Sequence, residues 1–225
     1  MVFKAIRKFG KSGPKPIEEV IKEEEMVVSK YEVIYDLIKS RRSVRDYTNK
    51  KVSKDVIEKI LDSVRYAPSA GNYQPWEMIV VENDEMRKNI VNAASNQEWM
   101  INAPVFIVAC VNDRLAGAVY GPRGKMLYGI QGVSAAIENI LLTAESLGLG
   151  TCWVGAFGEV AVARLLQCPE YVRPCAIITL GYPKEKPHMP ARQSKADYLH
   201  YEEYGENILE QKVRKQKKPV NMQLR

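Results

Sequence analysis

The apolar residues of this chain recur mostly three or four positions apart, which is the period of an amphipathic helix. The longest stripe runs from Lys125 to Leu147 and precedes Gly148, a residue type that often terminates helices. Another begins after Ser53, a favoured N-cap residue, and is stopped by Pro68. The pattern predicts helices over residues 31–39, 53–66, 84–94, 125–147, 159–166 and 204–215.

Shorter apolar segments rich in β-forming residues predict strands over residues 76–81, 104–111, 151–154 and 175–180. Residues 104–111 form an uninterrupted apolar run, which is typical of a strand buried on both faces. Helices and strands intermix without a strict strand–helix–strand alternation. The order of elements therefore favours an α+β fold in which helices pack on a sheet.

A chain of 225 residues with 46% hydrophobic side chains is long enough to bury one sizeable core. No linker rich in proline, glycine or serine divides its middle. It contains no run of about 18 apolar residues, so we expect no membrane span. Residues 1–7 lack the apolar stretch and the cleavage site of a secretory signal. We therefore expect a cytoplasmic protein.

The net charge of +6 is concentrated at the two ends of the chain. Residues 1–16 hold five basic residues and residues 211–225 hold six, with no acidic residue in either segment. The part between the two segments therefore carries a negative formal charge. Solvated tails explain this pattern, and an arm that binds nucleic acid or an anionic membrane is the alternative. Because no aromatic residue interleaves with the charges of residues 211–225, we expect no nucleic-acid partner.

Few residues of this chain could hold a metal or form a catalytic triad. The four cysteines form no C-x-x-C pair, and His188 and His200 are the only histidines, so we expect free thiols and no metal site. Gly148–Trp153 lacks the third glycine of a dinucleotide-binding loop. Gly121–Met126 lacks both the length and the Ser/Thr of a P-loop.

Two polar segments remain as candidates for ligand binding. Arg41–Arg45 combines guanidinium groups with the hydroxyl of Ser43, a set that suits an oxyanion such as phosphate. A solvated helix C-terminus, where cations are also favourable, is the alternative. Pro68–Trp76 is a polar, turn-forming loop that leads into an apolar strand, and it is either a ligand-binding loop or an ordinary turn.

With other segments in the same order, these two stretches resemble the nitroreductase family of FMN-dependent oxidoreductases. The resemblance covers residues 31–202. The matching segments are Arg41–Arg45, Ala67–Trp76, Ala103–Pro104, Gln131 with Ala136–Asn139, Leu147–Gly155 and Leu180–Pro183.

The resemblance implies a central mixed, mainly antiparallel sheet flanked by helices, in an intertwined homodimer with two FMN sites. Residues 31–202 would form the FMN-binding domain, after an N-terminal extension over 1–30 and before a C-terminal helix and basic tail over 203–225. NADH or NADPH would donate hydride to flavin N5. The flavin would then reduce a nitroaromatic, a quinone or a similar flat acceptor by ping-pong kinetics.

The family's site residues can be transferred position by position. Arg41, Ser43 and Arg192 would bind the FMN phosphate, with Arg42 in the same motif and Lys195 as a further candidate. Arg45 would lie along the ribityl chain toward the N1/O2 edge of the flavin. The remaining implied contacts come from Gln131, from the backbone of Gly155 and Ala156 near N5 and O4, and from Pro68, Ser69, Ala70 and Asn72 of the partner subunit.

No side chain is expected to act as a catalytic acid or base in this interpretation. Gly132 stands where many relatives have an acidic residue, so it offers no side chain for a polar contact there. Residues 113–125, with Tyr120, are expected to form part of a substrate lid. A flavin-dependent dehalogenase, a flavin-consuming enzyme and a non-enzymatic flavin carrier or sensor are the alternative functions.

Overall fold

A computed structural model describes residues 29–205 of the chain. The described residues divide into two compact units, one ending at Lys186 and the other beginning at Pro187. Residues 1–28 of the expected N-terminal extension, and residues 206–225 with the basic tail and nearly all of the helix expected over 204–215, lie outside the described residues. None of the described helices is long and apolar enough to cross a bilayer.

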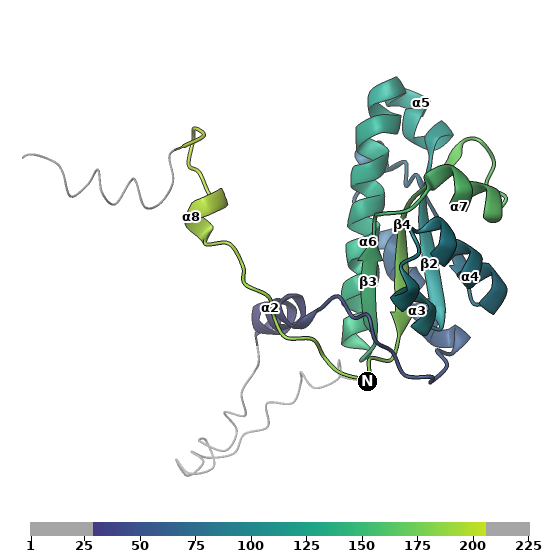
Figure 1. Cartoon of the computed structure of the whole chain (residues 1–225). Helices are drawn as coiled ribbons and strands as arrows, with labels where there is room; N and C mark the ends of the chain where they lie inside the picture. The colour runs from purple at the N-terminus through teal and green to yellow at the C-terminus, as the bar shows by residue number, and fades with distance from the viewer. Residues whose placement is uncertain (1–28, 206–225) are drawn as a thin grey trace, which may run out of the picture. The chain divides into compact units, whose positions relative to one another are not determined.

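The first unit is built on a four-stranded sheet with the order β1-β2-β4-β3 (Figure 1). The strands are β1 (Trp76–Val81), β2 (Val105–Asn112), β3 (Gly150–Val154) and β4 (Val172–Gly181). All paired strands are antiparallel. Within residues 29–205, parallel pairing is limited to an isolated bridge between Ser43 and Thr151. The expectation of a mainly antiparallel sheet is confirmed, whereas the described sheet contains no parallel strand.

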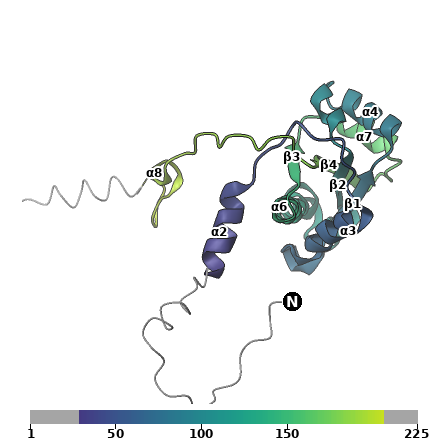
Figure 2. The same cartoon turned by 90° about the horizontal axis from the view of Figure 1, so that it is seen from below.

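Helices cover both faces of the sheet, as Figure 2 shows for α6 and α3 on one side and α4 and α7 on the other. The longer helices are α2 (Lys30–Ser40), α3 (Lys54–Asp62), α4 (Asp84–Ala93), α5 (Asp113–Arg123) and α6 (Gly129–Ser146). The shorter ones are α7 (Glu159–Leu165) and α8 (Lys195–Tyr198). Short helical turns span Ser63–Tyr66, Ala70–Asn72 and Glu98–Asn102, and a π-turn spans Gly124–Tyr128.

Strand β2 lies at the centre of the core. Ile107 and Ala109 pack with α3 and α6, whereas Phe106 and Val108 pack with α4 and α7. Because alternate side chains of a strand point to opposite faces, both faces of β2 must be apolar to be buried. Its residues are buried throughout, so the prediction from the uninterrupted apolar run is confirmed.

The segment between β2 and α6 differs from the sequence-based prediction. The helix predicted over 125–147 is present as the π-turn Gly124–Tyr128 followed directly by α6, whereas the preceding helix α5 was not predicted. The backbone bends at Gly121, where φ is +53° and ψ is −136°. That conformation requires glycine and interrupts the helical path. At the other end of α6, Gly148 has a φ of +74° directly after the C-cap, as predicted.

A buried hydrogen-bond network joins residues 44–47, which precede α3, to strand β4. The Tyr47 hydroxyl donates to the carbonyl oxygen of Val44 (2.6 Å) and lies 2.7 Å from the Thr179 hydroxyl. Burial raises the pKa of Tyr47 above its ordinary value of 10.0. Burial likewise raises the pKa of the Cys110 thiol above 9.0. Both groups are therefore held neutral in the folded protein.

We expect the free energy of unfolding to fall as the pH rises above about 9, because the unfolded chain releases these protons near their ordinary pKa values while the folded chain retains them. Each group contributes at most about 1.4 kcal/mol per pH unit. Tyr47→Phe should flatten the fall above pH about 10, at a cost of about 1–2 kcal/mol at neutral pH. Urea denaturation between pH 8 and 11 measures both effects. An unchanged alkaline slope in Tyr47→Phe would contradict this assignment.

Candidate functional site

The segment Arg41–Arg45 runs along the outer edge of β3. The Val44 backbone N–H donates to the Thr151 carbonyl oxygen (2.9 Å), which fixes the segment to the strand. Val44 points inward against Gly150, where an added Cβ would lie 2.7 Å from the valine side chain. Because side chains alternate along an extended backbone, Ser43 and Arg45 on either side of Val44 point outward and are exposed.

The cations of this segment gather at the beginning of β3. Cys152 is buried there, and burial raises the pKa of its thiol, while Arg45, Ser43 and Arg41 act in the opposite direction. The isolated bridge between Ser43 and Thr151 independently places this segment beside the first half of β3. An anion placed beside this segment would meet the guanidinium group of Arg41 and the hydroxyl donor of Ser43, a set that suits a phosphate group.

The two neighbouring arginines of the segment are engaged differently. Arg41 makes only a loose ion pair, with 3.8 Å between its Nε and a carboxylate oxygen of Glu138. Arg42 turns back and donates to the carbonyl oxygens of Lys39 and Arg41, which satisfies the C-terminal end of α2. Arg41 is therefore the freer of the two cations in this structure.

Gly155 and Ala156 follow the other end of β3. A Cβ added to Gly155 would have no heavy atom within 4 Å, so its backbone is open to a ligand. The Ala156 carbonyl oxygen accepts a hydrogen bond from Gln97 Nε2 (2.9 Å). The Arg45 guanidinium lies 5.5 Å from the centre of the Trp99 ring. The turn after α4 thus contributes two residues to the site.

Neither Gln97 nor Trp99 was predicted from the sequence as a site residue. The available signal was the polar run Ser95–Glu98 between two apolar segments. Ser95 and Asn96 both have positive φ angles, of +57° and +52°, which is uncommon for residues other than glycine.

The loop after Pro68 lies on a different part of the molecule. The backbone N–H of Gln74 donates to Ser69 Oγ (3.0 Å), which closes the loop on itself. The loop packs against α6 at Gly132, where an added Cβ would lie 3.5 Å from the Ser69 Cβ. Gln131, the neighbour of Gly132, is exposed.

Helix α6 separates this loop from Gly155 within one chain. Ile130 and Ser134 line a small cavity of about 190 Å³ together with Gly155. Gly132 lies between them in sequence and therefore projects to the opposite side of the helix, because successive residues turn by about 100°. The loop and Gly155 consequently face opposite sides of a helix that is about 10 Å wide with its side chains.

A model of the nitroreductase family matches residues 38–97 and 91–182 of this chain. These ranges cover more than half of the sequence. The chain belongs to the nitroreductase family. It is an oxidoreductase by this membership, and the resemblance found in the sequence is confirmed.

Curated relatives match across much of the chain. It is 39% identical over 154 residues to a putative NADH dehydrogenase/NAD(P)H nitroreductase of Archaeoglobus fulgidus, covering 67% of this chain and 85% of the relative. It is 30% identical over 195 residues to an FMN reductase [NAD(P)H] of Bacillus subtilis, covering 77% and 78% of the two chains.

Solved structures of relatives show the same fold. NfrA2 of B. megaterium superposes with a TM-score of 0.71 at 29% identity, covering 80% of this chain and 78% of that one. A putative NADH dehydrogenase/NAD(P)H nitroreductase of Bacteroides thetaiotaomicron superposes with a TM-score of 0.67 at 30% identity, covering 76% and 98%. The α+β fold of this chain is thus the fold of its relatives.

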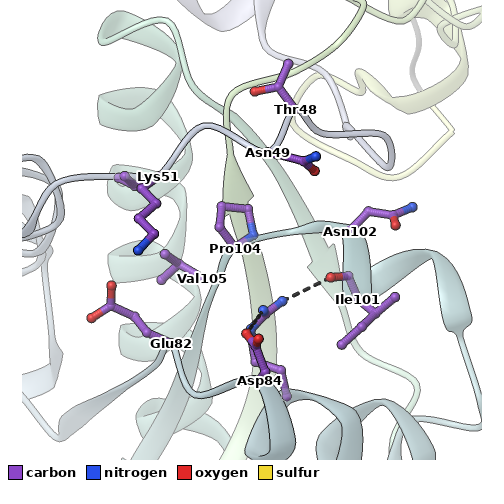
Figure 3. Close-up of a pocket in the computed structure, with 11 residues that line it drawn as sticks. Thr48, Asn49, Lys51, Glu82, Asp84, Ile101, Asn102, Pro104 and Val105 are labelled. Atoms are coloured by element: carbon purple, nitrogen blue, oxygen red, sulfur yellow. Dashed lines mark hydrogen bonds and ion pairs between the residues drawn. The ribbon is translucent and has the colours of Figure 1, made fainter.

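A cavity of about 470 Å³ lies apart from these residues, near the end of β1 and the beginning of β2 (Figure 3). Lys51 and Glu82 point toward each other across it. Arg87, which is only 8% exposed, donates to the carbonyl oxygens of Ile101 (3.0 Å) and Ala103 and pairs with Asp84. These bonds hold the turn that leads into β2, so we interpret Arg87 as a structural cation.

The second unit contains Arg192 and Lys195, which are both exposed. Their assignment to the FMN phosphate stays a prediction. His188 is also exposed, and His200 packs against Tyr204 with 4.6 Å between the ring centres. Among the described residues, no three side chains of histidine, cysteine, aspartate or glutamate converge as metal ligands.

Proposed function

We propose that this nitroreductase binds FMN and transfers hydride from NADH or NADPH to a flat, electron-poor acceptor such as a nitroaromatic or a quinone. Bound FMN would supply the redox chemistry by accepting and donating hydride at N5. The proposal rests chiefly on the arrangement along β3. The segment Arg41–Arg45 is fixed beside its first half through Ser43 and Val44, and the open backbone of Gly155 follows its end.

The residues present fit FMN in charge and in shape. Thr151 and Gly155 are four residues apart, which corresponds to about 13 Å along an extended strand. That separation suits an extended ribityl phosphate, with the phosphate at Arg41 and Ser43 and the isoalloxazine ring beside Gly155. Arg45 would place its positive charge near the N1/O2 edge, where it would favour the reduced, anionic flavin. The open space at Gly155 lets its backbone N–H approach the ring.

We propose that a second copy of the chain completes each site. Pro68, Ser69, Ala70 and Asn72 face the opposite side of α6 from Gly155, so they would reach the flavin held by the partner. Helix α2 supports this assembly because its apolar row Tyr31, Ile34, Tyr35 and Ile38 is exposed, Ile34 by 57%. An apolar helix face of this kind favours burial against another protein surface.

Ile34→Asp should weaken dimerisation, because it places a charge in the centre of the apolar row of α2. Sedimentation velocity at several protein concentrations measures the effect. Lys30→Asp, at the exposed start of the same helix, is the charge-changing control. A dimer of unchanged stability in Ile34→Asp would remove α2 from the interface.

The names of two relatives support the proposed hydride donor and the proposed class of hydride acceptor. The Archaeoglobus relative is named for NADH and NAD(P)H, and the Bacillus subtilis relative is named an FMN reductase. The second name favours free flavin as an alternative acceptor, since it too is flat and electron-poor. Competition between free FMN and a quinone for reduction would distinguish the two.

A visible spectrum of the purified protein, followed by anaerobic titration with each nicotinamide, tests the proposed function. We expect a flavin spectrum that is bleached by NADH or NADPH and restored by a quinone. Bound flavin that neither nicotinamide reduces would indicate a carrier or sensor instead. Turnover of a halogenated phenol without turnover of quinones would indicate a dehalogenase. A colourless protein that does not bind added FMN would overturn the proposal.

A further inference from the structure

The loop Ser69–Gln74 has a strained backbone. Gly71, Asn72 and Gln74 have φ angles of +58°, +58° and +50°. Residues other than glycine adopt this left-handed region at a cost, and it persists where surrounding contacts determine the conformation. Inside the loop, Gln74 donates through its backbone N–H to Ser69 Oγ (3.0 Å) and through Nε2 to Asn72 Oδ1 (3.2 Å).

Three aromatic rings, Tyr73, Tyr120 and Tyr128, form a tyrosine cluster beside this loop. The rings of Tyr73 and Tyr120 lie 6.4 Å apart at 82°, and those of Tyr120 and Tyr128 lie 5.2 Å apart at 89°. Both pairs have the edge-to-face geometry that aromatic rings favour. Tyr128 is itself held, because its hydroxyl oxygen accepts a hydrogen bond from Arg123 Nε (2.8 Å).

Tyr120 occupies the centre of the tyrosine cluster, and its hydroxyl oxygen lies beside Gly71 of the loop. A Cβ added to Gly71 would lie 3.1 Å from the Tyr120 hydroxyl oxygen and 2.8 Å from the Tyr73 ring. The two tyrosines therefore enclose the Cα of Gly71 on its open side. On another side, the loop packs against Gly132 of α6 through Ser69. The strained loop is thus held between α6 and the tyrosine cluster.

Tyr120 comes from a segment remote from the loop in sequence. It lies in α5 directly before the bend at Gly121, and α5 leads through the π-turn into α6. The segment that joins β2 to α6 therefore supports the loop by direct contact. This observation gives Tyr120 a more specific role than the substrate lid expected from the sequence.

We propose that Tyr120 is a positioning residue for FMN. Through the contact of its ring with Tyr73 it holds the loop in the shape that presents Ser69, Ala70 and Asn72 to the flavin, an inference that rests on the proposed function. Tyr120 acts through the packing of its ring. Among the described residues, its hydroxyl makes no hydrogen bond that would have to be replaced.

Tyr120→Ala tests this role when the affinity of the FMN-free dimer for added FMN is measured by quenching of flavin fluorescence. We expect the affinity to fall by about tenfold, the size expected for losing one or two aromatic pairs. Tyr120→Phe should restore it to within about twofold, because the ring contacts remain. Val119→Ala is the matched control, since it truncates an exposed side chain of the same helical turn and should leave the affinity unchanged.

The double variant Tyr73→Ala/Tyr120→Ala tests whether Tyr120 affects FMN affinity through the same loop as Tyr73 or independently of Tyr73. If both rings act on the same loop, the double variant should bind FMN about as weakly as the weaker single variant. Losses that add in full would overturn the proposal. If Tyr120→Ala does not fold by circular dichroism, Tyr73→Ala carries the test, with the same expected loss.

Two results distinguish this inference from the proposed function. A wild-type protein that binds FMN, with equal affinity in Tyr120→Ala or Tyr73→Ala, would overturn the role of Tyr120 and leave the function standing. A wild-type protein that binds no FMN would overturn the function and this role with it. Loss of affinity in Tyr120→Phe equal to that in Tyr120→Ala would also overturn the packing role.

Discussion

Arg41→Ala is expected to lower the affinity for FMN by about 10- to 100-fold, while FMN-saturated enzyme keeps its turnover. A charge-assisted hydrogen bond to phosphate contributes about 1.5–3 kcal/mol, which corresponds to this range. Arg41 is the expected contributor because its ion pair with Glu138 is loose, whereas Arg42 is bound to carbonyl oxygens of α2. Equilibrium dialysis followed by the flavin absorbance measures the loss.

Arg65→Ala is the matched control for Arg41→Ala. Arg65 is an exposed arginine whose described ion pair is with Asp62, so its removal changes the net charge equally. A general loss of attraction for anions would affect both variants alike. An Arg41→Ala protein that stays fully loaded with FMN after dialysis would show that another group binds the phosphate.

Arg87→Met is expected to destabilise the fold by about 2–4 kcal/mol, because the carbonyl oxygens of Ile101 and Ala103 would lose their donor at a largely buried position. For a chain of this size the melting temperature should fall by roughly 5–15 °C. Because methionine retains most of the side-chain length, the loss of stability is caused more by the missing hydrogen bonds than by lost packing. Differential scanning calorimetry measures the change.

Lys88→Met, at the next position of α4, removes the same charge from an exposed side chain and should change the stability by less than about 0.5 kcal/mol. Asp84→Asn should also have a small effect, since that carboxylate is 82% exposed. Equal stability of Arg87→Met and Lys88→Met would show that the turn before β2 does not depend on this cation.

Much of the fold could be predicted because its signals are local. The apolar run of β2 requires burial on both faces, and the structure places alternate residues in the two core clusters. Gly148 terminates α6 as its residue type predicts. Helix α5 could not be predicted in this way, because its segment is rich in glycine and small residues, and it depends on tertiary contacts such as Ala116 against Gly124.

The residues of the candidate site were likewise predictable from the sequence only in part. Arg41, Ser43 and Arg45 were found because their chemistry and close spacing are visible in a short stretch of sequence. Gln97 was missed because its role depends on a hydrogen bond to Ala156, which is 59 positions away. Tyr120 was noted as part of a lid, and its contact with Gly71 could not be foreseen, since it joins two segments that are distant in sequence.

The sequence by itself determined the four strands and most of the helices, which strand is buried on both faces, and which family the chain belongs to, because periodicity and motifs depend on neighbouring positions. The tertiary structure decided that Arg42 turns back to α2, that Arg87 is buried, and that the Pro68 loop and Gly155 face opposite sides of α6. These outcomes depend on which distant segments share space. The packing of the whole core decides which segments lie side by side, and no single position of the sequence encodes it.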